Sequence, residues 1–398
     1  MTEEDPQRID LLDELEAVLD LGRRAPGSDA ERRTANHLRD RLRALGRNAD
    51  VESFAVYPAW PLAYVLLAAA AVGASVLSVY VPVAGAALAL ATALLTFVDA
   101  GLLIPVTRRL FGRRASQNVV SFDTGGKPGA VVLVAHLDAG RAGLVHGERT
   151  ARRRAALGRA LRRPVGGLSV VFWAELAVLA CTLLRLVGID STALTAVQFV
   201  PTLVLIVAIA LLADVALAGT KAGENDNASG AVTLLSLAAD PPELDHFDVH
   251  ILFTGAQKAG AAGMRDFLKR HGLPRDSTVV VNVEQVGSGE VRYTRREGAL
   301  LTQRSHPQLV ALAGEDDSVA PIVNRSASDG HAATASGYAA ITVTCRDDFD
   351  YASGRVDERA LASAEHFCAE LLERLDAEVG PSILAPVDAT ALSEPEAS

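Results

Sequence analysis

The chain has 398 residues, of which 49% are hydrophobic and only 5% aromatic, so it has ample material for a large core built mostly from Ala, Leu and Val. Its formal charge of −10 at pH 7 argues against nucleic acid as a partner. An odd number of widely spaced cysteines excludes a disulfide scaffold and a thiolate zinc site; they are Cys181, Cys345 and Cys368.

Two long apolar blocks predict four membrane-spanning helices. Residues 53–98 contain no charged side chain, and the break at Val81-Pro82-Val83 divides this block into two spans long enough for a bilayer. A second block, 164–218, is divided near Gly188-Ile189-Asp190-Ser191. The spans form two hairpins, 57–107 and 164–218, and are predicted at Ala59–Tyr80, Ala84–Val106, Val165–Val187 and Ala193–Leu217. The alternative is a set of buried core helices in a large soluble enzyme.

The positions of arginine predict the orientation of these spans. Four arginines follow the second span within 108–114, and six precede the third within 152–163. The two turns on the other side contain no Lys or Arg, although Arg185 lies close to one. The positive-inside rule therefore predicts a multi-pass protein of the cell membrane, with its soluble domain and both termini in the cytoplasm. Three carboxylates fall in or near the cytoplasmic halves of the spans, where we expect interfacial or packing roles rather than transport: Asp99, Glu175 and Asp214.

Outside the apolar blocks, strand-like and helix-like segments alternate along the chain. Strands are predicted at 50–56, 118–122, 130–135, 249–254, 278–283 and 338–345, and helices at 10–21, 29–45, 230–239, 261–269 and 361–375. Buried strands alternating with helices are typical of an α/β domain with three αβα layers around a parallel sheet. We expect this domain to comprise 1–56, 108–163 with its Arg-rich linker, and 219–378, interrupted by the hairpins and followed by a disordered tail at 379–398.

Several polar side chains lie next to the predicted strands. His136 and Asp138 follow the strand at 130–135, and Glu284 follows the strand at 278–283. Asp226 lies in a polar loop that opens a helix, and His331 precedes the strand at 338–345. Ligands of α/β proteins bind at the carboxyl ends of the strands, so these side chains could converge there. A single His-x-Asp pair would be weak support for a metal site, and the whole set is stronger.

The order of these motifs resembles metallopeptidase family 28, the di-zinc aminopeptidases and their carboxypeptidase relatives, with this chain as a divergent, membrane-embedded member. The motifs that carry the resemblance are Ala135-His136-Leu137-Asp138, Asp226-Asn227-Ala228-Ser229-Gly230 and Arg24-Ala25-Pro26-Gly27-Ser28. It covers residues 10–56, 116–140, 222–290 and 322–375, nearly all of the soluble portion. It implies a zinc-aminopeptidase-like (phosphorylase/hydrolase-like) αβα domain that binds zinc and hydrolyses amide bonds at peptide termini.

The resemblance also implies roles for individual residues. His136 would bind one zinc ion, and Asp138 would orient it from outside the coordination sphere. Asp226 would bridge two metal ions, and Glu284 would complete the first site, where the family usually has Asp. His331 would bind the second metal, although Gly330 separates it from Asp329 whereas the family usually has Asp and His adjacent.

The departure that matters most is Gln257-Lys258, at the position of two consecutive glutamates in the family. The first of those glutamates is the general base and the second a ligand of the second zinc. A carboxamide has no useful basicity near neutral pH, and an ammonium group puts positive charge where a metal ligand should be negative.

Three outcomes for the metal follow. One zinc ion could bind to His136, Asp226 and Glu284, with Lys258 in the place of the second metal. Alternatively, the fold binds no metal, or two metals bind with Lys258 displaced or deprotonated.

Two functions remain open at this stage. The chain is either a membrane-anchored zinc metallopeptidase with an altered or impaired catalytic site, or a catalytically inactive pseudo-peptidase that acts as a binding or scaffold module. The second hairpin stands between Asp138 and Asp226, at the mouth of the site. The expected partners are therefore membrane lipids, with the arginines of 141–163 facing anionic headgroups, and a peptide or the terminus of a membrane protein.

Overall fold

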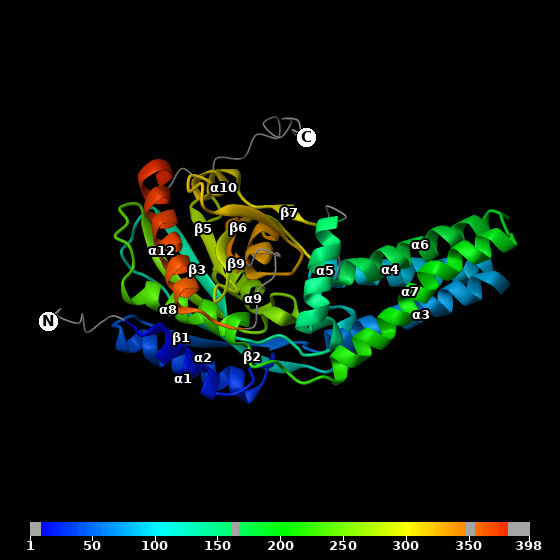
Figure 1. Ribbon diagram of the computed structural model, residues 1–398, viewed down its shortest axis with the longest axis horizontal. Coiled ribbons are helices and arrows are strands. Elements are labelled where there is room, and N and C mark those ends of the chain that lie inside the picture. Colours follow the sequence, from blue (N-terminus) through cyan, green and yellow to red (C-terminus); the bar gives the residue numbers. More distant parts are fainter. Residues whose placement is uncertain (1–8, 161–166, 347–354, 381–398) are drawn as a thin grey trace.

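The computed structural model describes residues 9–160, 167–346 and 355–380. It consists of a sheet domain with helices on both faces and a bundle of four long helices that projects from one side (Figure 1). Strands that come before, between and after the two helical hairpins join one sheet, so the hairpins are insertions into the sheet domain.

The sheet is mixed rather than wholly parallel. Its strand order is β1-β2-β4-β3-β5-β9-β6-β7, with β8 paired to β6. The central strands β4, β3, β5 and β9 are parallel, whereas β1 and β2 run antiparallel to their neighbours. Strand β6 is antiparallel to β9 and β7 and parallel to β8. The strands are β1 Asp50–Val56, β2 Arg114–Ser121, β3 Gly129–His136, β4 Phe247–Thr254, β5 Thr278–Val283, β6 Glu290–Glu297, β7 Gln303–Arg304, β8 Ala320–Asn324 and β9 Ala339–Arg346.

Successive apolar side chains of the central strands pack into two different cores, one on each face of the sheet. In β3, Leu133 and Ala135 belong to one apolar cluster, whereas Val132 and Val134 belong to another. Successive side chains of a strand point to opposite faces, so a strand that is apolar throughout must be covered on both sides. The three-layer αβα arrangement follows from this pattern.

The larger cluster is covered by α1 Leu11–Asp20, α2 Asp29–Ala44, α8 Ser229–Ala239, α10 Pro307–Ala313 and α12 Glu358–Arg374. The smaller is covered by α9 Ala262–His271 and α11 Asp329–Ala335. Side-chain caps begin several of these helices: Asp10 accepts hydrogen bonds at the start of α1, Ser28 at the start of α2, and Ser328 at the start of α11.

The projecting bundle consists of α3 Trp60–Tyr80, α4 Pro82–Thr96 with the π-helical turn η1 Phe97–Gly101, α6 Leu168–Leu186 and α7 Thr192–Leu217. By length and composition, each of these four is able to cross a membrane. Small residues line the inside of the bundle, such as Ala68 and Ala71, while large apolar side chains such as Val200 and Val207 face outward and are exposed. An apolar exterior of this kind is what a lipid environment requires.

The structure departs from the sequence predictions at several points. The second span, predicted to continue to Val106, leaves the α-helix after Thr96 and ends at Gly101. Leu103 then has a left-handed φ of 57°, and its side chain packs into the smaller core. The basic linker forms a helix that was not predicted, α5 Glu148–Ala160, preceded by the short turn η3 Leu144–His146. The predicted disordered tail lies outside the described residues, except for its first two positions.

Candidate metal site

Three predicted ligands come together at the carboxyl ends of adjacent parallel strands. His136 is the last residue of β3, and Glu284 follows β5 directly. Asp226 reaches the same place from the loop that precedes α8, where its peptide bond to Asn227 is cis. These three side chains form a group whose ligand atoms all lie within 4.8 Å of one another.

The geometry of this group suits a single cation. The Nε2 of His136 lies 3.7 Å from Asp226 Oδ1 and 3.6 Å from Glu284 Oε1. His136 is fully buried, and its Nε2 has no hydrogen-bond partner within the described part of the chain. An imidazole nitrogen and two carboxylate oxygens are ligands that zinc accepts. The donor set therefore fits one metal ion.

A lysine ammonium also lies in this group. The Nζ of Lys258 is 2.7 Å from Asp226 Oδ1 and 3.2 Å from Glu284 Oε1, the same two oxygens that face His136. Lys258 comes from the short 3-10 turn η5 Gln257–Ala259, which follows β4. A positive charge thus lies directly against the oxygens that a metal would use.

Burial and charge shift the pKa values in the site in opposite directions. Burial alone would raise the pKa of Glu284, but Lys258 and His136 lower it to about 2. The same groups hold the pKa of Asp226 well below its ordinary range. Burial would lower the pKa of Lys258, and the two carboxylates instead raise it above that of a free lysine. Lys258 is therefore a permanent cation here.

Asp138 contacts the backbone of the lysine turn more directly than it contacts His136. Its two carboxylate oxygens accept hydrogen bonds from the backbone N–H groups of Gln257 at 2.9 Å and Lys258 at 2.8 Å. The Nδ1 of His136 lies 2.8 Å from the backbone carbonyl of Asp138 and 3.4 Å from its carboxylate. Asp138 thus fixes the turn that presents the lysine, in addition to facing the imidazole.

The side chain at the general-base position is turned into the protein. Gln257 is 3% exposed, and its Nε2 donates to the backbone carbonyl of Ala327 at 2.9 Å. A carboxamide held in this way has neither the basicity nor the freedom to take a proton from water.

His331 does not join the three ligands. It lies in the first turn of α11, is 2% exposed, and is absent from the group formed by His136, Asp226 and Glu284. Burial lowers its pKa to about 4, so the imidazole is neutral. Among the described residues, His331 therefore belongs to no group of three or more side chains that could hold a metal ion.

Several residues that the chemical argument had not singled out hold the site together. Arg24 is fully buried and donates to the backbone carbonyls of Leu137 at 2.9 Å and Gly223 at 2.8 Å, joining the loops that carry His136 and Asp226. Gln285 donates from Nε2 to Asp226 Oδ1 at 3.1 Å. Arg24 belongs to the Arg-Ala-Pro-Gly-Ser motif and could have been found there, whereas nothing in the sequence singles out Gln285.

The chain matches no family model, and no curated protein is significantly similar to it in sequence. Its fold is similar to that of a zinc aminopeptidase from Bacillus subtilis, with 12% identity, a TM-score of 0.50, and 94% of this chain and 97% of that chain covered. An aminopeptidase from Aneurinibacillus sp. strain AM-1 aligns with 13% identity and a TM-score of 0.50 over 96% of this chain and 97% of that one.

A Zn-dependent exopeptidase from Parabacteroides distasonis aligns with 11% identity and a TM-score of 0.50 over 91% of this chain and 96% of that one. At such identities the likeness concerns the fold. The α/β fold of zinc aminopeptidases, expected from the motifs, is confirmed, with a sheet that is mixed where a parallel one was predicted.

Proposed function

We propose that this chain is a membrane-anchored protein of the aminopeptidase fold that binds a ligand without hydrolysing it, with the ammonium group of Lys258 in the place of a metal ion. The position of its Nζ, 2.7 Å from Asp226 Oδ1 and 3.2 Å from Glu284 Oε1, carries the proposal. Glu284 is buried and Asp226 is partly buried, so the two carboxylates require a compensating positive charge, and here the chain supplies it covalently. A metal ion would have to displace this tethered cation.

The absence of a proton acceptor at position 257 supports the same proposal. General-base catalysis contributes about 10²–10⁴-fold to the rate of such reactions. Gln257 cannot provide it, and its amide is held by the carbonyl of Ala327. A site that lacks both the base and an anionic ligand is better suited to binding than to hydrolysis.

A second candidate function rests on His136. Its buried Nε2 and the Oε2 of Glu284 have no hydrogen-bond partner among the residues described, which is the state expected of ligands that await a metal. His136, Asp226 and Glu284 would then hold one zinc ion, and Lys258 would neutralise the excess charge of the carboxylates. Such an ion would supply a Lewis acid for weak amide hydrolysis.

Anchoring in the cell membrane is supported by the four apolar helices and by the arginines that flank them. The second hairpin leaves the sheet domain next to the site, since Arg141 pairs with Thr220 in a bridge only a few residues from Asp138 and Asp226. The ligand would therefore be met at the cytoplasmic surface of the membrane, as a tethered peptide or the terminus of a membrane protein. Reporter fusions after residue 160 and at the C-terminus test the topology, and an external location for either contradicts it.

Restoring the two acidic side chains tests the chemical proposal. The Gln257→Glu, Lys258→Glu double variant should bind zinc and hydrolyse an aminoacyl p-nitroanilide, whereas the natural protein and Lys269→Glu, on the exposed side of α9, should not. Hydrolysis by the natural protein that a chelator abolishes and zinc restores would contradict the proposal and favour the second candidate.

A further inference from the structure

The helix α5 does not belong to the layers of the sheet domain. It packs against the short turn η3, and in Figure 1 it stands between the sheet domain and the bundle, with its axis across that of the bundle. A helix perpendicular to membrane-spanning helices lies parallel to the membrane plane. An isolated helix of 13 residues is marginally stable in water, so α5 needs a partner.

The charge of α5 is opposite to that of the chain as a whole. Its sequence, Glu-Arg-Thr-Ala-Arg-Arg-Arg-Ala-Ala-Leu-Gly-Arg-Ala, has five arginines and one glutamate, while the chain carries a net charge of −10. The side chains of Arg149 and Arg153 are exposed, and so is that of Leu157 at 49%. Arginines interspersed with small apolar residues favour the headgroup region of a membrane over its hydrocarbon core.

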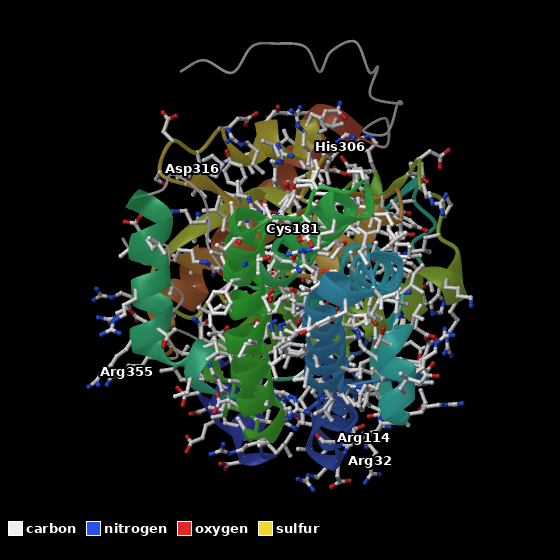
Figure 2. All side chains as sticks on the ribbon, turned by 90° about the vertical axis from the view of Figure 1, so that its right-hand side faces the viewer. Arg32, Arg114, Cys181, His306, Asp316 and Arg355 are labelled. Atoms are coloured by element: carbon white, nitrogen blue, oxygen red, sulfur yellow. The ribbon has the colours of Figure 1, made fainter. Side chains whose placement is uncertain are left out.

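A second basic segment lies at the base of the bundle. After η1 the chain continues through the short 3-10 turn η2 Thr107–Phe111. The exposed residues of this segment are apolar at its start and mostly basic at its end: Leu102, Ile104, Val106, Arg109, Leu110, Arg113 and Arg114. Figure 2 looks at the bundle from its free end, with α5 to the left of it and Arg114 below and to the right. Positive charge therefore lies on two sides of the bundle, at the level where the helices leave the sheet domain.

We infer that α5 and residues 102–114 form a surface that binds anionic phospholipid headgroups in the leaflet next to the sheet domain. This inference rests on the proposed membrane anchoring and adds the chemistry of the lipid. Charge complementarity selects anionic over zwitterionic headgroups, and continuity with the four spans selects a membrane over a soluble polyanion. The segment between β3 and α6 carries Asp138, η3 and α5 in that order, so the lipid-binding surface lies close to the mouth of the site.

The inference is tested with the full-length protein in lipid nanodiscs. A fluorophore is attached to the variant Leu157→Cys, because the three native cysteines are buried. Its quenching by lipids with a nitroxide near the headgroup is compared in nanodiscs with and without anionic lipid. We expect strong quenching only with anionic lipid. Replacing Arg149 and Arg153 with Gln should lower the ratio of bound to released helix by on the order of 30-fold. The matched control replaces Arg359 and Arg374 on α12, at the far side of the sheet domain, and should change nothing.

Two further probes separate this inference from the anchoring it rests on. A fluorophore at Val207→Cys, exposed in the middle of α7, should be quenched by deep nitroxide lipids, and one at His366→Cys on α12 by neither lipid. Quenching at Val207 without quenching at Leu157 would overturn the lipid-binding surface while leaving the anchoring intact. Loss of quenching at Val207 would refute the anchoring itself. Equal quenching at Leu157 in zwitterionic and anionic discs would also overturn the inference.

Discussion

Lys258→Met removes the positive charge between Asp226 and Glu284 while keeping a side chain of similar length. Removing one partner of a buried ion pair costs about 3–5 kcal/mol, because the opposite charge loses its compensation. Here the side chain of Asp226 is 26% exposed and His136 still faces both carboxylates, so we expect a loss of about 2–3 kcal/mol in the free energy of unfolding. In a chain of this size, the unfolding temperature should fall by on the order of 5 °C.

Zinc should then stabilise the variant. With Lys258 gone, His136, Asp226 and Glu284 keep their arrangement as three ligands without a competing cation. Zinc at 100 times its dissociation constant would add about 2.7 kcal/mol, enough to return the unfolding temperature close to that of the natural protein. Thermal unfolding in mild detergent, with zinc or with a chelator, measures both effects.

The matched control is Lys269→Met, which removes an exposed lysine from α9 and should alter neither the stability nor the response to zinc. The reasoning is refuted if Lys258→Met unfolds at the temperature of the natural protein, or if zinc stabilises both proteins equally.

Three further changes test other parts of the account, each by thermal unfolding in detergent. Arg108→Ala should cost about 3 kcal/mol, because this buried guanidinium pairs with Asp99 at the end of the first hairpin and donates to the carbonyl of Ala259 at 2.7 Å. Gly330→Ala should cost about 1–3 kcal/mol, because its Cβ would lie 2.3 Å from Thr342 Oγ1. Burial lowers the pKa of His250, so as the pH falls through about 6.5 the unfolded chain takes up this proton more readily than the folded chain, and the natural protein loses stability. The His250→Asn variant should therefore lose less stability than the natural protein between about pH 7 and 5.

Controls for the first two changes come from exposed positions. Arg109→Ala removes an exposed arginine beside Arg108, and Gly147→Ala places a Cβ 3.4 Å from its nearest neighbour, Leu144 O. Both should be close to neutral. Equal losses for Arg108→Ala and Arg109→Ala would show that the buried contacts between hairpin and turn contribute nothing.

The sequence predicted the parts of the fold that depend on simple periodicity. The strand at 278–283 and the four apolar helices were found because continuous apolar runs bounded by polar residues indicate buried strands or spans. The region 290–324 was missed. Its strand β6 reads Glu-Val-Arg-Tyr-Thr-Arg-Arg-Glu, and a strand with charged side chains at five of its eight positions lacks a clear apolar pattern.

The sequence predicts the positions of those site residues that lie at the carboxyl ends of strands. His136 and Glu284 meet because β3 and β5 are adjacent and parallel, and the rule for the carboxyl ends of strands applies to both. The place of His331 relative to these ligands could not be predicted, because it lies in a helix, where the direction of a side chain depends on how the helix packs. Gly330 lets α11 approach Thr342 closely, and this packing cannot be read from one sequence.

The buried arginines show a further limit of the sequence. Arg108 was read as one of the basic residues that flank a span, yet it is 3% exposed and connects the first hairpin to the turn that carries Lys258. An arginine next to a span and one that crosses a domain junction look the same in a sequence. Only the tertiary contacts distinguish them.

If Lys258 takes the place of a metal ion, the natural protein should hold little zinc. The full-length protein is purified in mild detergent, incubated with zinc and freed of excess ion, and its zinc content is measured by elemental mass spectrometry. We expect far less than one zinc ion per chain. One tightly held ion per chain would show that Lys258 does not replace the metal.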